Sequence, residues 1–309
     1  MVCEHKKRQE YRKFDGATLQ ICDACGLVSL EAEAAKKNPE VLYDEYYKNE
    51  TGGRFNFGIE YVIRIFRFFR ALKIFSIHPG AKSILDIGSG RGLMLYYLKK
   101  FFGYKTAVGI QPSKPALEFS RKKLGLEVYD RDFLELDFGG RRFDVITMWH
   151  VLEHVVEPER YIEKISQYLE ANGKFVVEVP NFDSWTAHAT GFYWLGLDLR
   201  YHLHFFTPET LSGLLKRHHL RIRKIHTFSL EYSIFISAQS ILSLWTHSDH
   251  LLFEWLQTGK FRPVIFWHIF LFVLILPFSL LINLLLFFSK KGEVLLIIAE
   301  RNHGQDPFL

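Results

Sequence analysis

The feature that most constrains the fold is an apolar strand that runs into a glycine-rich turn, ILDIGSGRGLML at residues 84–95. Strands and helices alternate from there, in the order helix 92–101, strand TAVGI, helix 113–124, strand LEVY, strand FDVITMW, helix 158–169 and strand FVVEVP. Such alternation is typical of an open, largely parallel sheet with helices on both faces. Pro158 suits a first helical turn, and ANGK predicts a turn before the last strand.

The glycines of this turn are Gly88, Gly90 and Gly92, and Asp86 precedes them near the end of the strand. Glycine allows φ > 0 and lets the backbone approach a ligand closely. A dinucleotide fingerprint G-x-G-x-x-G would need its third glycine at position 93, which is Leu93. The spacing G-x-G-x-G therefore argues against a pyrophosphate ligand.

From about Ser83 to Pro180 the chain resembles the class I S-adenosylmethionine-dependent methyltransferases, with the motifs in the family's order. The resemblance implies a Rossmann-like α/β fold and S-adenosylmethionine as cofactor. In that family the acidic residue at the strand end and the glycine loop hold the methionine and ribose parts of the cofactor. The matching positions here are Asp86, Gly88 and Gly90, with Ser89 between the glycines.

Two further segments match the cofactor site of this family. Its second strand usually ends in Asp or Glu, which accepts hydrogen bonds from the ribose hydroxyls; here VGIQPS places Gln111 and Pro112 at that point. A Gln side chain can still accept and donate, but it lacks the charge-assisted component, so weaker binding is expected. The resemblance places Asp132 at the exocyclic amine of adenine and Phe133 against the ring.

The segment MWHVLEHVVEP follows the fourth strand, at the edge where parallel α/β sheets bind ligands. It is similar to the ubiquinone-biosynthesis O-methyltransferases, in which LEHV recurs, and it makes His150 a candidate to touch the cofactor or position the substrate. In some of those relatives two acids and a His here bind a divalent metal. Only Glu153 and His154 match, since His150 replaces the first acid; the alternative is that these two residues orient the loop through hydrogen bonds.

The segment LDLRYHLHFFTPET lies after the fifth strand, where this family usually builds substrate pockets. His202 and His204 alternate with apolar residues, so in an extended segment both would face one side. A neutral imidazole can take a proton from a hydroxyl that attacks the methyl group. We expect His202 as the base and His204 as the alternate, with a structural role as the other interpretation. Asn181 is a further pocket candidate, and Thr207 is the expected N-cap of the next helix.

The lead sequence contains CDAC at Cys22 to Cys25, the form of a zinc knuckle. Cys3 and His5 can complete a tetrahedral site, and similar leads occur in several methyltransferases of this type. One residue separates Cys3 from His5, where a knuckle has two. A structural zinc is the preferred interpretation; a vestigial ribbon and redox chemistry are the alternatives.

The run IFWHIFLFVLILPFSLLINLLLFF, residues 265–288, contains no Asp, Glu, Lys or Arg. The class I fold ends in a hairpin, for which HTFSLEYSIFISA and GEVLLIIAERN are the expected strands, so both ends of the run lie on one side of any membrane. Pro277 divides the run into 12 and 11 residues, and at ~1.5 Å per residue neither half crosses ~30 Å of hydrocarbon. We expect a re-entrant or in-plane helical hairpin; packing on the protein itself or a dimer interface is the alternative.

A second amphipathic segment, residues 54–75, repeats Arg64, Arg67, Arg70 and Lys73 at every third position among large apolar residues. This spacing predicts a basic helix that adds an electrostatic membrane contact. The stretch before the apolar run contains Trp245, Phe253 and Trp255, which suit a helix at a membrane interface.

Composition narrows the class of protein. The chain has 309 residues, a formal net charge of +5 and 16% aromatic residues, which fits neither a disordered chain nor a nucleic-acid-binding tail. Its three cysteines lie within the first 25 residues and fit a reducing compartment. The start lacks the apolar region of a signal peptide, so a cytoplasmic protein, peripheral or monotopic at the cytoplasmic face of a membrane, is expected.

These patterns predict an α/β protein with a seven-stranded class I methyltransferase sheet, a zinc-ribbon-like lead and a helical insertion before the last strand. The expected boundaries are 1–50 for the lead, 51–238 and 292–303 for the methyltransferase domain, and 239–291 for the insertion. The expected reaction is methyl transfer to an oxygen, with a carbon as the second choice, of a hydrophobic or lipid-linked acceptor such as a quinone precursor or a lipid-linked sugar. The alternative is an inactive membrane-bound scaffold, suggested by Gln111. The sequence leaves a homodimer open.

Overall fold

The computed structural model describes residues 3, 5, 7–14, 17–31, 57–286 and 288–301. The expected boundaries at 50 and 303 and the first three residues of the expected basic helix lie outside these ranges.

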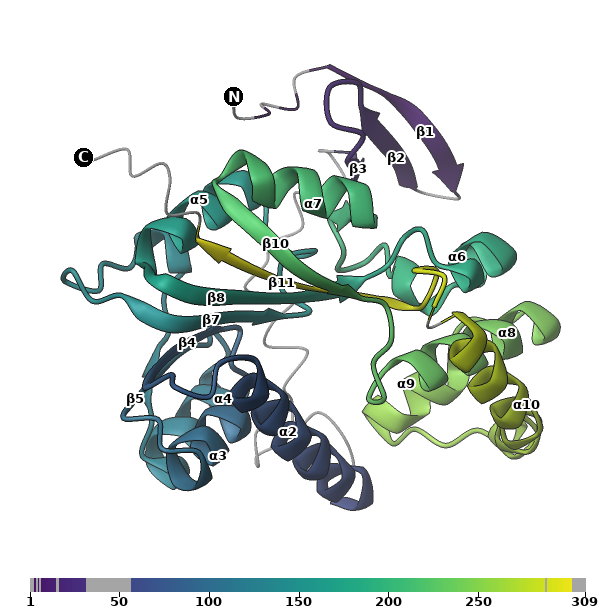
Figure 1. The fold of residues 1–309 in the computed structure, drawn as a ribbon. Coiled ribbons are helices and arrows are strands. Elements are labelled where there is room, and N and C mark those ends of the chain that lie inside the picture. Colours follow the sequence, from purple (N-terminus) through teal and green to yellow (C-terminus); the bar gives the residue numbers. More distant parts are fainter. Residues whose placement is uncertain are drawn as a thin grey trace.

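A seven-stranded sheet with the order β10-β11-β8-β7-β4-β5-β6 forms the centre of the chain (Figure 1). The strands are β4 (Ser83–Ile87), β5 (Thr106–Ile110), β6 (Glu127–Tyr129), β7 (Phe143–Trp149), β8 (Leu169–Pro180), β10 (Leu220–His226) and β11 (Val294–Arg301). Neighbours among β4 to β8 pair in parallel, whereas β11 runs antiparallel to both β8 and β10. The expected seven-stranded α/β fold is confirmed. The segment VLLIIAER is, as expected, the last strand of the chain and runs antiparallel within the sheet.

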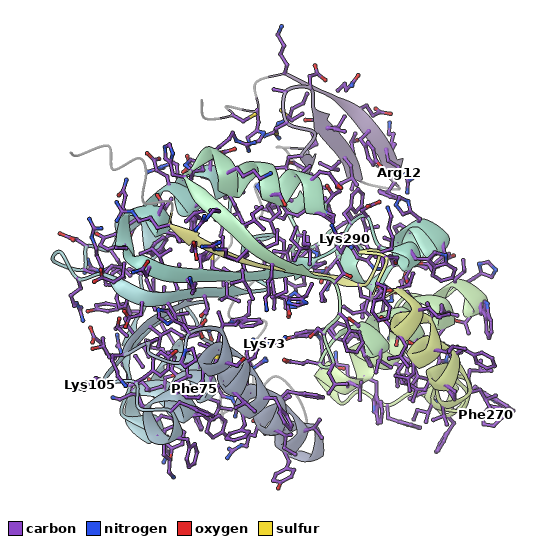
Figure 2. All side chains as sticks on the ribbon, viewed as in Figure 1. Arg12, Lys73, Phe75, Lys105, Phe270 and Lys290 are labelled. Atoms are coloured by element: carbon purple, nitrogen blue, oxygen red, sulfur yellow. The ribbon has the colours of Figure 1, made fainter. Side chains whose placement is uncertain are left out.

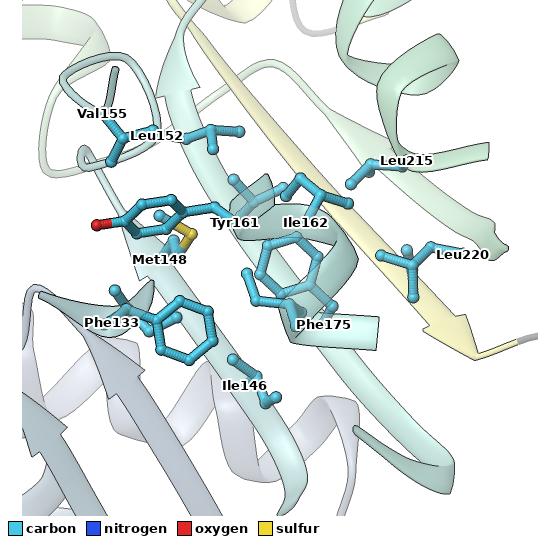
Figure 3. Close-up of a cluster of buried hydrophobic side chains, with 14 of the residues drawn as sticks. Phe133, Ile146, Met148, Leu152, Val155, Tyr161, Ile162, Phe175, Leu215 and Leu220 are labelled. Carbon is cyan, nitrogen blue, oxygen red and sulfur yellow. The ribbon is translucent and has the colours of Figure 1, made fainter. Parts of the chain in front are cut away.

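Helices cover both faces of this sheet (Figure 1). One face carries α2 (Phe57–Ile77), α3 (Leu93–Phe101) and α4 (Lys114–Glu118), which continues as a π-helical turn over Phe119–Lys123; the other carries α5 (Pro158–Tyr168) and α7 (Pro208–Arg217). Each face has its own apolar core, because the central strands are buried on both sides. Figure 3 shows Phe133, Tyr161, Ile162 and Phe175 in the core beneath α5.

The expected helix starts are confirmed. Pro158 occupies the first position of α5. The Thr207 hydroxyl accepts a hydrogen bond from the backbone N–H of Thr210 at 3.2 Å, and the Thr210 hydroxyl accepts one from the Thr207 N–H at 2.9 Å. Threonine thus completes a capping box in the place where Glu or Gln is usual.

Two strand predictions are wrong in their bounds. The strand paired with β11 is β10, which ends at His226, whereas Ser233 begins a helix instead of lying in the expected strand. The Ser237 and Ser240 hydroxyls bond to the carbonyls of Ser233 and Ile236, each four residues earlier, as serines in a helix can. The expected ANGK turn forms an irregularity inside β8, where residues 170–173 separate two paired positions.

The insertion consists of α8 (Ser233–Thr246), α9 (Leu251–Thr258) and α10 (Val264–Leu286). Pro277 lies inside α10 and does not divide it, so the prediction of two short halves is wrong. The Pro277 ring is on the exposed side of α10, where losing one backbone hydrogen bond does not disturb the packing against α8. The chain leaves the sheet along α8 and returns to it along α10, whose 23 residues measure ~35 Å at ~1.5 Å each.

The described part of the lead forms a small antiparallel sheet with β9 (His204–Phe205) of the main domain. Its strands are β1 (Arg8–Phe14), β2 (Ala17–Cys22) and β3 (Val28–Leu30). Between β8 and α7 the chain also forms α6 (Trp185–Thr190) and short 3-10 turns at Gly191–Tyr193 and Leu195–Leu197; a further turn, Phe133–Glu135, follows β6.

Candidate active site

The glycine turn after β4 has the backbone geometry that a closely approaching ligand needs. Gly88, Gly90 and Gly92 have φ of 77°, 53° and 68°, in the left-handed region. A Cβ at Gly88 would lie 2.3 Å from Val151 Cγ2, so a larger residue would force Val151 to shift. The turn therefore depends on glycine for both its conformation and its space.

Asp86 is buried beside this turn. The Thr147 hydroxyl, on the neighbouring strand β7, donates a hydrogen bond of 2.6 Å to Asp86 Oδ1. Burial raises the pKa of Asp86 to about 6, against the opposing effects of Thr147 and Arg70. A buried carboxylate with one donor at the carboxyl ends of parallel strands is positioned to accept hydrogen bonds from a polar ligand.

The end of β5 offers two more polar groups. Gln111 is buried, and its Oε1 accepts a hydrogen bond of 3.0 Å from the Ser113 N–H. Pro112, between them, is exposed. The buried hydroxyl of Ser113 has no hydrogen-bond partner within the described chain, although Ser113 stands at the N-cap of α4. Sequence reasoning missed Ser113; its place two residues after the strand end is the signal that points to it.

The residues expected at adenine are held by local contacts. Asp132 accepts a hydrogen bond of 2.7 Å from the Leu134 N–H and one of 2.5 Å from the Tyr161 hydroxyl. Phe133 is buried in the core, with its ring 5.5 Å from that of Tyr161 (Figure 3). Asp132 is exposed and retains lone pairs for a further donor.

His150 lies between two buried carboxylates at the ends of β7 and β8. Its Nδ1 is 3.3 Å from Glu153 and its Nε2 is 3.3 Å from Glu178, while the Tyr232 ring lies 4.3 Å from the imidazole. Burial disfavours the charged imidazole, but the two carboxylates outweigh burial and raise the pKa of His150 to about 10. At neutral pH His150 is therefore a fixed cation with φ of 53°, suited to positioning and unsuited to removing a proton.

Glu178 is a residue that sequence reasoning missed. It is buried near the end of β8, in the otherwise apolar run FVVEVP. A buried acid in a central strand is costly unless it is paired, so its presence in such a run is the signal that could have found it.

The inner face of α2 also reaches this region. Glu231 lies 2.5 Å from Arg67 and 2.7 Å from Arg70, and the Arg70 guanidinium stacks 4.2 Å above the Trp149 ring. Burial opposes ionisation of Glu231, but the two arginines lower its pKa to about 2. The expectation that Arg67 and Arg70 face a membrane is wrong, because both are directed toward the strand ends and the loop after β10.

A second cluster joins Glu153, His154 and His202. The His154 Nδ1–H donates to the Tyr201 carbonyl and the His202 Nδ1–H to the Gly196 carbonyl, both at 2.9 Å. Since a carbonyl only accepts, Nδ1 carries the proton in each imidazole, and in the neutral form Nε2 then has a lone pair. The donor atoms of the three residues lie within 4.8 Å of one another. Two imidazoles and one carboxylate are a set that can hold a divalent metal.

His204 is not beside His202, contrary to the expected alternation. Its Nδ1 makes a hydrogen bond of 2.9 Å with the Ser29 hydroxyl, and β9 pairs with β3 of the lead. Burial lowers the pKa of His204 to about 4. The reason for the difference is that β9 is only two residues long, so His202 lies in the preceding turn and His204 faces the lead.

Cys3, His5, Cys22 and Cys25 meet at the end of the lead. Cys3 Sγ is 3.7 Å from Cys22 Sγ, and His5 Nδ1 is 3.5 Å from Cys3 Sγ and 3.4 Å from Cys25 Sγ. All four donor atoms lie within 4.8 Å of one another. Three sulfurs and one imidazole at these separations fit a tetrahedral zinc ion, so the unusual Cys3–His5 spacing does not keep the ligands apart.

Asn181 occupies a structural position. Its amide donates to the Gly292 carbonyl at 2.8 Å, and its Oδ1 accepts from the Asp183 N–H at 3.1 Å. These bonds tie the end of β8 to the turn that enters β11, which explains why Asn181 is buried.

Part of this chain is similar in sequence to known proteins. A family model described as a methyltransferase domain matches residues 60–225, more than half of the chain. An uncharacterized methyltransferase of Anoxybacillus flavithermus is 34% identical over 103 residues, covering 32% of this chain and 48% of that protein. A ubiquinone biosynthesis O-methyltransferase of Coxiella burnetii is 30% identical over 105 residues, covering 32% and 44%. The chain thus spans about half the length of these curated relatives.

The fold is also that of a solved enzyme. The 1,6-didemethyltoxoflavin-N1-methyltransferase of Burkholderia thailandensis, crystallised with 1,6-didemethyltoxoflavin and S-adenosylhomocysteine, is 16% identical with a TM-score of 0.50. The alignment covers 95% of this chain and 99% of that one. With the glycine turn, the strand order and the family match together, this chain belongs to the methyltransferase domain family.

Proposed function

We propose that this protein transfers a methyl group from S-adenosylmethionine to an oxygen, with a carbon as the second choice, of a hydrophobic or lipid-linked small molecule at a membrane surface. The observation that carries the methyltransferase assignment is the buried Asp86–Thr147 pair beside a turn whose three glycines all have φ > 0, in a chain of this family. The proposed class of acceptor is inferred from the apolar insertion.

The cofactor supplies an electrophilic methyl group on a sulfonium sulfur. Asp86 and the turn formed by Gly88, Ser89 and Gly90 bind its methionine and ribose parts. The side chains at the end of β5 bind its hydroxyls, Gln111 by its amide and Ser113 by its unpaired hydroxyl, with Pro112 shaping the strand end. Asp132 accepts from the adenine amine, and Phe133 supports that segment from the core.

His202 is proposed as the base for an acceptor hydroxyl. Its Nδ1–H is held by the Gly196 carbonyl, which leaves Nε2 free to accept the proton as the acceptor oxygen attacks the methyl group. His150, as a cation between Glu153 and Glu178, holds the carboxyl ends of β7 and β8 in one geometry. His204, on β9, ties the same segment to the lead through its hydrogen bond with Ser29.

The insertion is proposed to enter the cytoplasmic leaflet and return. In the part of the chain that the structure describes, α10 is the one helix long and apolar enough to cross a membrane, and 17% of its most apolar window is buried. Its polar residues Ser279 and Asn283 face α8, and His268 contacts Ser248 in the loop after α8, whereas Phe270, Phe278 and other large apolar residues face outward. This reverses the pattern of a water-soluble helix, and it fits lipid contact.

We also propose the division into three parts, with a structural zinc in the lead. Cys3, His5, Cys22 and Cys25 are the ligands. The end of β10 at His226 supports starting the insertion directly after that strand instead of at residue 239.

Incubation of the protein with radiolabelled S-adenosylmethionine and fractionated lipid extracts tests the proposal. A lipid that gains label and the mass of one methylene is expected. Binding of S-adenosylmethionine without transfer to any lipid-soluble fraction would contradict the acceptor class. Absence of binding would favour the alternative, an inactive scaffold, for which the neutral Gln111 is the supporting observation.

A further inference from the structure

The outer surface of α2 is apolar, and three of its charged residues, Glu60, Arg67 and Arg70, face the protein. Glu60 pairs with Arg91 on the inner side, where Arg67 and Arg70 also meet Glu231. The outward residues are large and 36–68% exposed: Tyr61, Val62, Ile65, Phe68, Phe69 and Leu72. They recur at helical spacing and form one stripe, which we call the α2 stripe.

Although α2 also buries Ala71 and Ile74, its exposed apolar stripe and inward ion pairs are inverted relative to a helix of a water-soluble protein, which buries its apolar face and exposes its charges. The same inversion occurs in α10, the helix proposed to enter lipid. Two helices with the same inversion indicate the same surroundings, because water would favour the opposite orientation in both.

The two helices lie on the same side of the molecule. In Figure 1, α2 and α10 lie below the sheet, and the lead lies above it. Glu231 joins α2 to the loop that begins the insertion, two residues before α8. The two inverted surfaces are therefore held in one relative position by an ion pair.

The flanks of the α2 stripe match a helix that lies in a membrane interface. The Arg64 side chain is half-exposed, and Lys73, labelled in Figure 2, is exposed. Long basic side chains at such positions can reach lipid headgroups with their charge. The aromatic rings of Phe68 and Phe101, 6.1 Å apart, extend the apolar surface onto α3. Basic residues beside an aromatic and aliphatic face are typical of interfacial helices.

We propose that the α2 stripe is a second lipid contact, which enters the acyl boundary of the bilayer that receives α10 and binds by apolar burial instead of by charge. This rests on the membrane part of the proposed function. It replaces the expected electrostatic contact, since two of the four basic residues of α2 are turned inward. The active-site region between α2 and the insertion then faces the bilayer.

Lipid photo-crosslinking in the full-length protein tests this proposal. Phe69→p-benzoylphenylalanine puts a probe of nearly the same shape on the α2 stripe. Phe270→p-benzoylphenylalanine is the matched probe on α10, since both phenylalanines are 54% exposed, and Phe192→p-benzoylphenylalanine, at 48%, is the control beside the lead. The variants are reconstituted with vesicles of phosphatidylcholine alone, which removes attraction to anionic lipid.

Irradiation is expected to give acyl-chain adducts from positions 69 and 270 and none above background from position 192. Adducts from Phe270 without any from Phe69 would overturn the α2 contact and leave the insertion standing. A Phe69 adduct to a second copy of the chain would also overturn it, in favour of a dimer. If neither position labels lipid, both membrane claims fall, while calorimetric binding of S-adenosylmethionine to the same variants still tests the methyltransferase assignment separately.

Discussion

Arg70 lies 2.7 Å from Glu231. This pair ties helix α2, beside the glycine turn, to the loop that leads into the apolar insertion. Arg67 reaches the same carboxylate from one turn earlier. The pair thus links a proposed membrane-bound element to the proposed active site, and its loss has a measurable cost.

Glu231→Gln is expected to lower the free energy of unfolding by about 2 kcal/mol, because it leaves two largely buried guanidinium groups without their anion. The arginines lower the pKa of Glu231 from 4.5 to about 2, so the stabilisation is present above pH 4.5 and disappears as the pH falls toward 2. Denaturant unfolding of wild type and variant across this range checks both points. Glu118→Gln, which removes a fully exposed pair with Lys122, is the control and should change little. Equal stability of Glu231→Gln and wild type would show that the pair does not hold the insertion.

His150→Gln is expected to remove a specific pH dependence. Because the folded-state pKa of His150 is raised from 6.5 to about 10, its contribution to stability is complete below pH 6.5 and is lost as the pH rises through 10. Wild type should therefore lose stability on the alkaline side, and the variant, which carries no titrating imidazole, should have a flatter profile. Thermal unfolding at a series of pH values in this range measures the difference. Parallel profiles of wild type and variant would show that a charged His150 does not stabilise the fold.

Much of the fold could be predicted from sequence because short-range signals fix it. The strand, glycine turn and helix around Asp86 each require particular residue types. The apolar run VLLIIAER, which ends at Arg301, suits a strand buried in the sheet. The sequence did not reveal the helix from Ser233, because the aromatic and β-branched residues of SIFIS also suit a strand. The i−4 hydrogen bonds of its serines are visible only in three dimensions. Pro277 was misleading for a similar reason: its effect depends on which side of α10 it occupies.

The site was predictable in the same uneven way. The cofactor positions follow strand ends, which sequence identifies. The separation of His202 from His204 depends on a two-residue strand that exists because the lead pairs with it, and no local pattern encodes that contact. Glu178 and Ser113 are recognised as site residues only from their three-dimensional surroundings, which are His150 beside Glu178 and the unpaired hydroxyl of Ser113 at the end of β5.

Purified protein is expected to contain about one zinc per chain, bound by the four ligands of the lead. Replacing both Cys22 and Cys25 with Ser should release the metal and loosen the pairing of β3 with β9, since binding energy there is also folding energy. Metal analysis and hydrogen exchange at Val28 and Phe205 measure the two effects. Unchanged exchange in the metal-free variant would show that the lead folds without zinc.

His202→Ala is expected to lower turnover by roughly 10² to 10⁴, with little change in affinity for S-adenosylmethionine, as for loss of a general base. His204→Ala instead removes a hydrogen bond to the lead, so it should affect stability more than the chemical step. Single-turnover rates beside unfolding curves separate the two roles. The assignment of the base is wrong if His202→Ala keeps the wild-type rate, or if its pH–rate profile is unchanged.

The most direct test of the central claim is calorimetric titration of S-adenosylmethionine into wild type, Gly88→Ala and Gly139→Ala. Both glycines have φ > 0, 77° and 61°, so both substitutions strain the backbone. Only Gly88 is crowded, with Val151 Cγ2 2.3 Å from an added Cβ, whereas no atom lies within 4 Å of a Cβ at Gly139. The account predicts binding by wild type and Gly139→Ala, and loss of binding by a folded Gly88→Ala. Wild-type affinity in Gly88→Ala, or no binding by wild type, would contradict it.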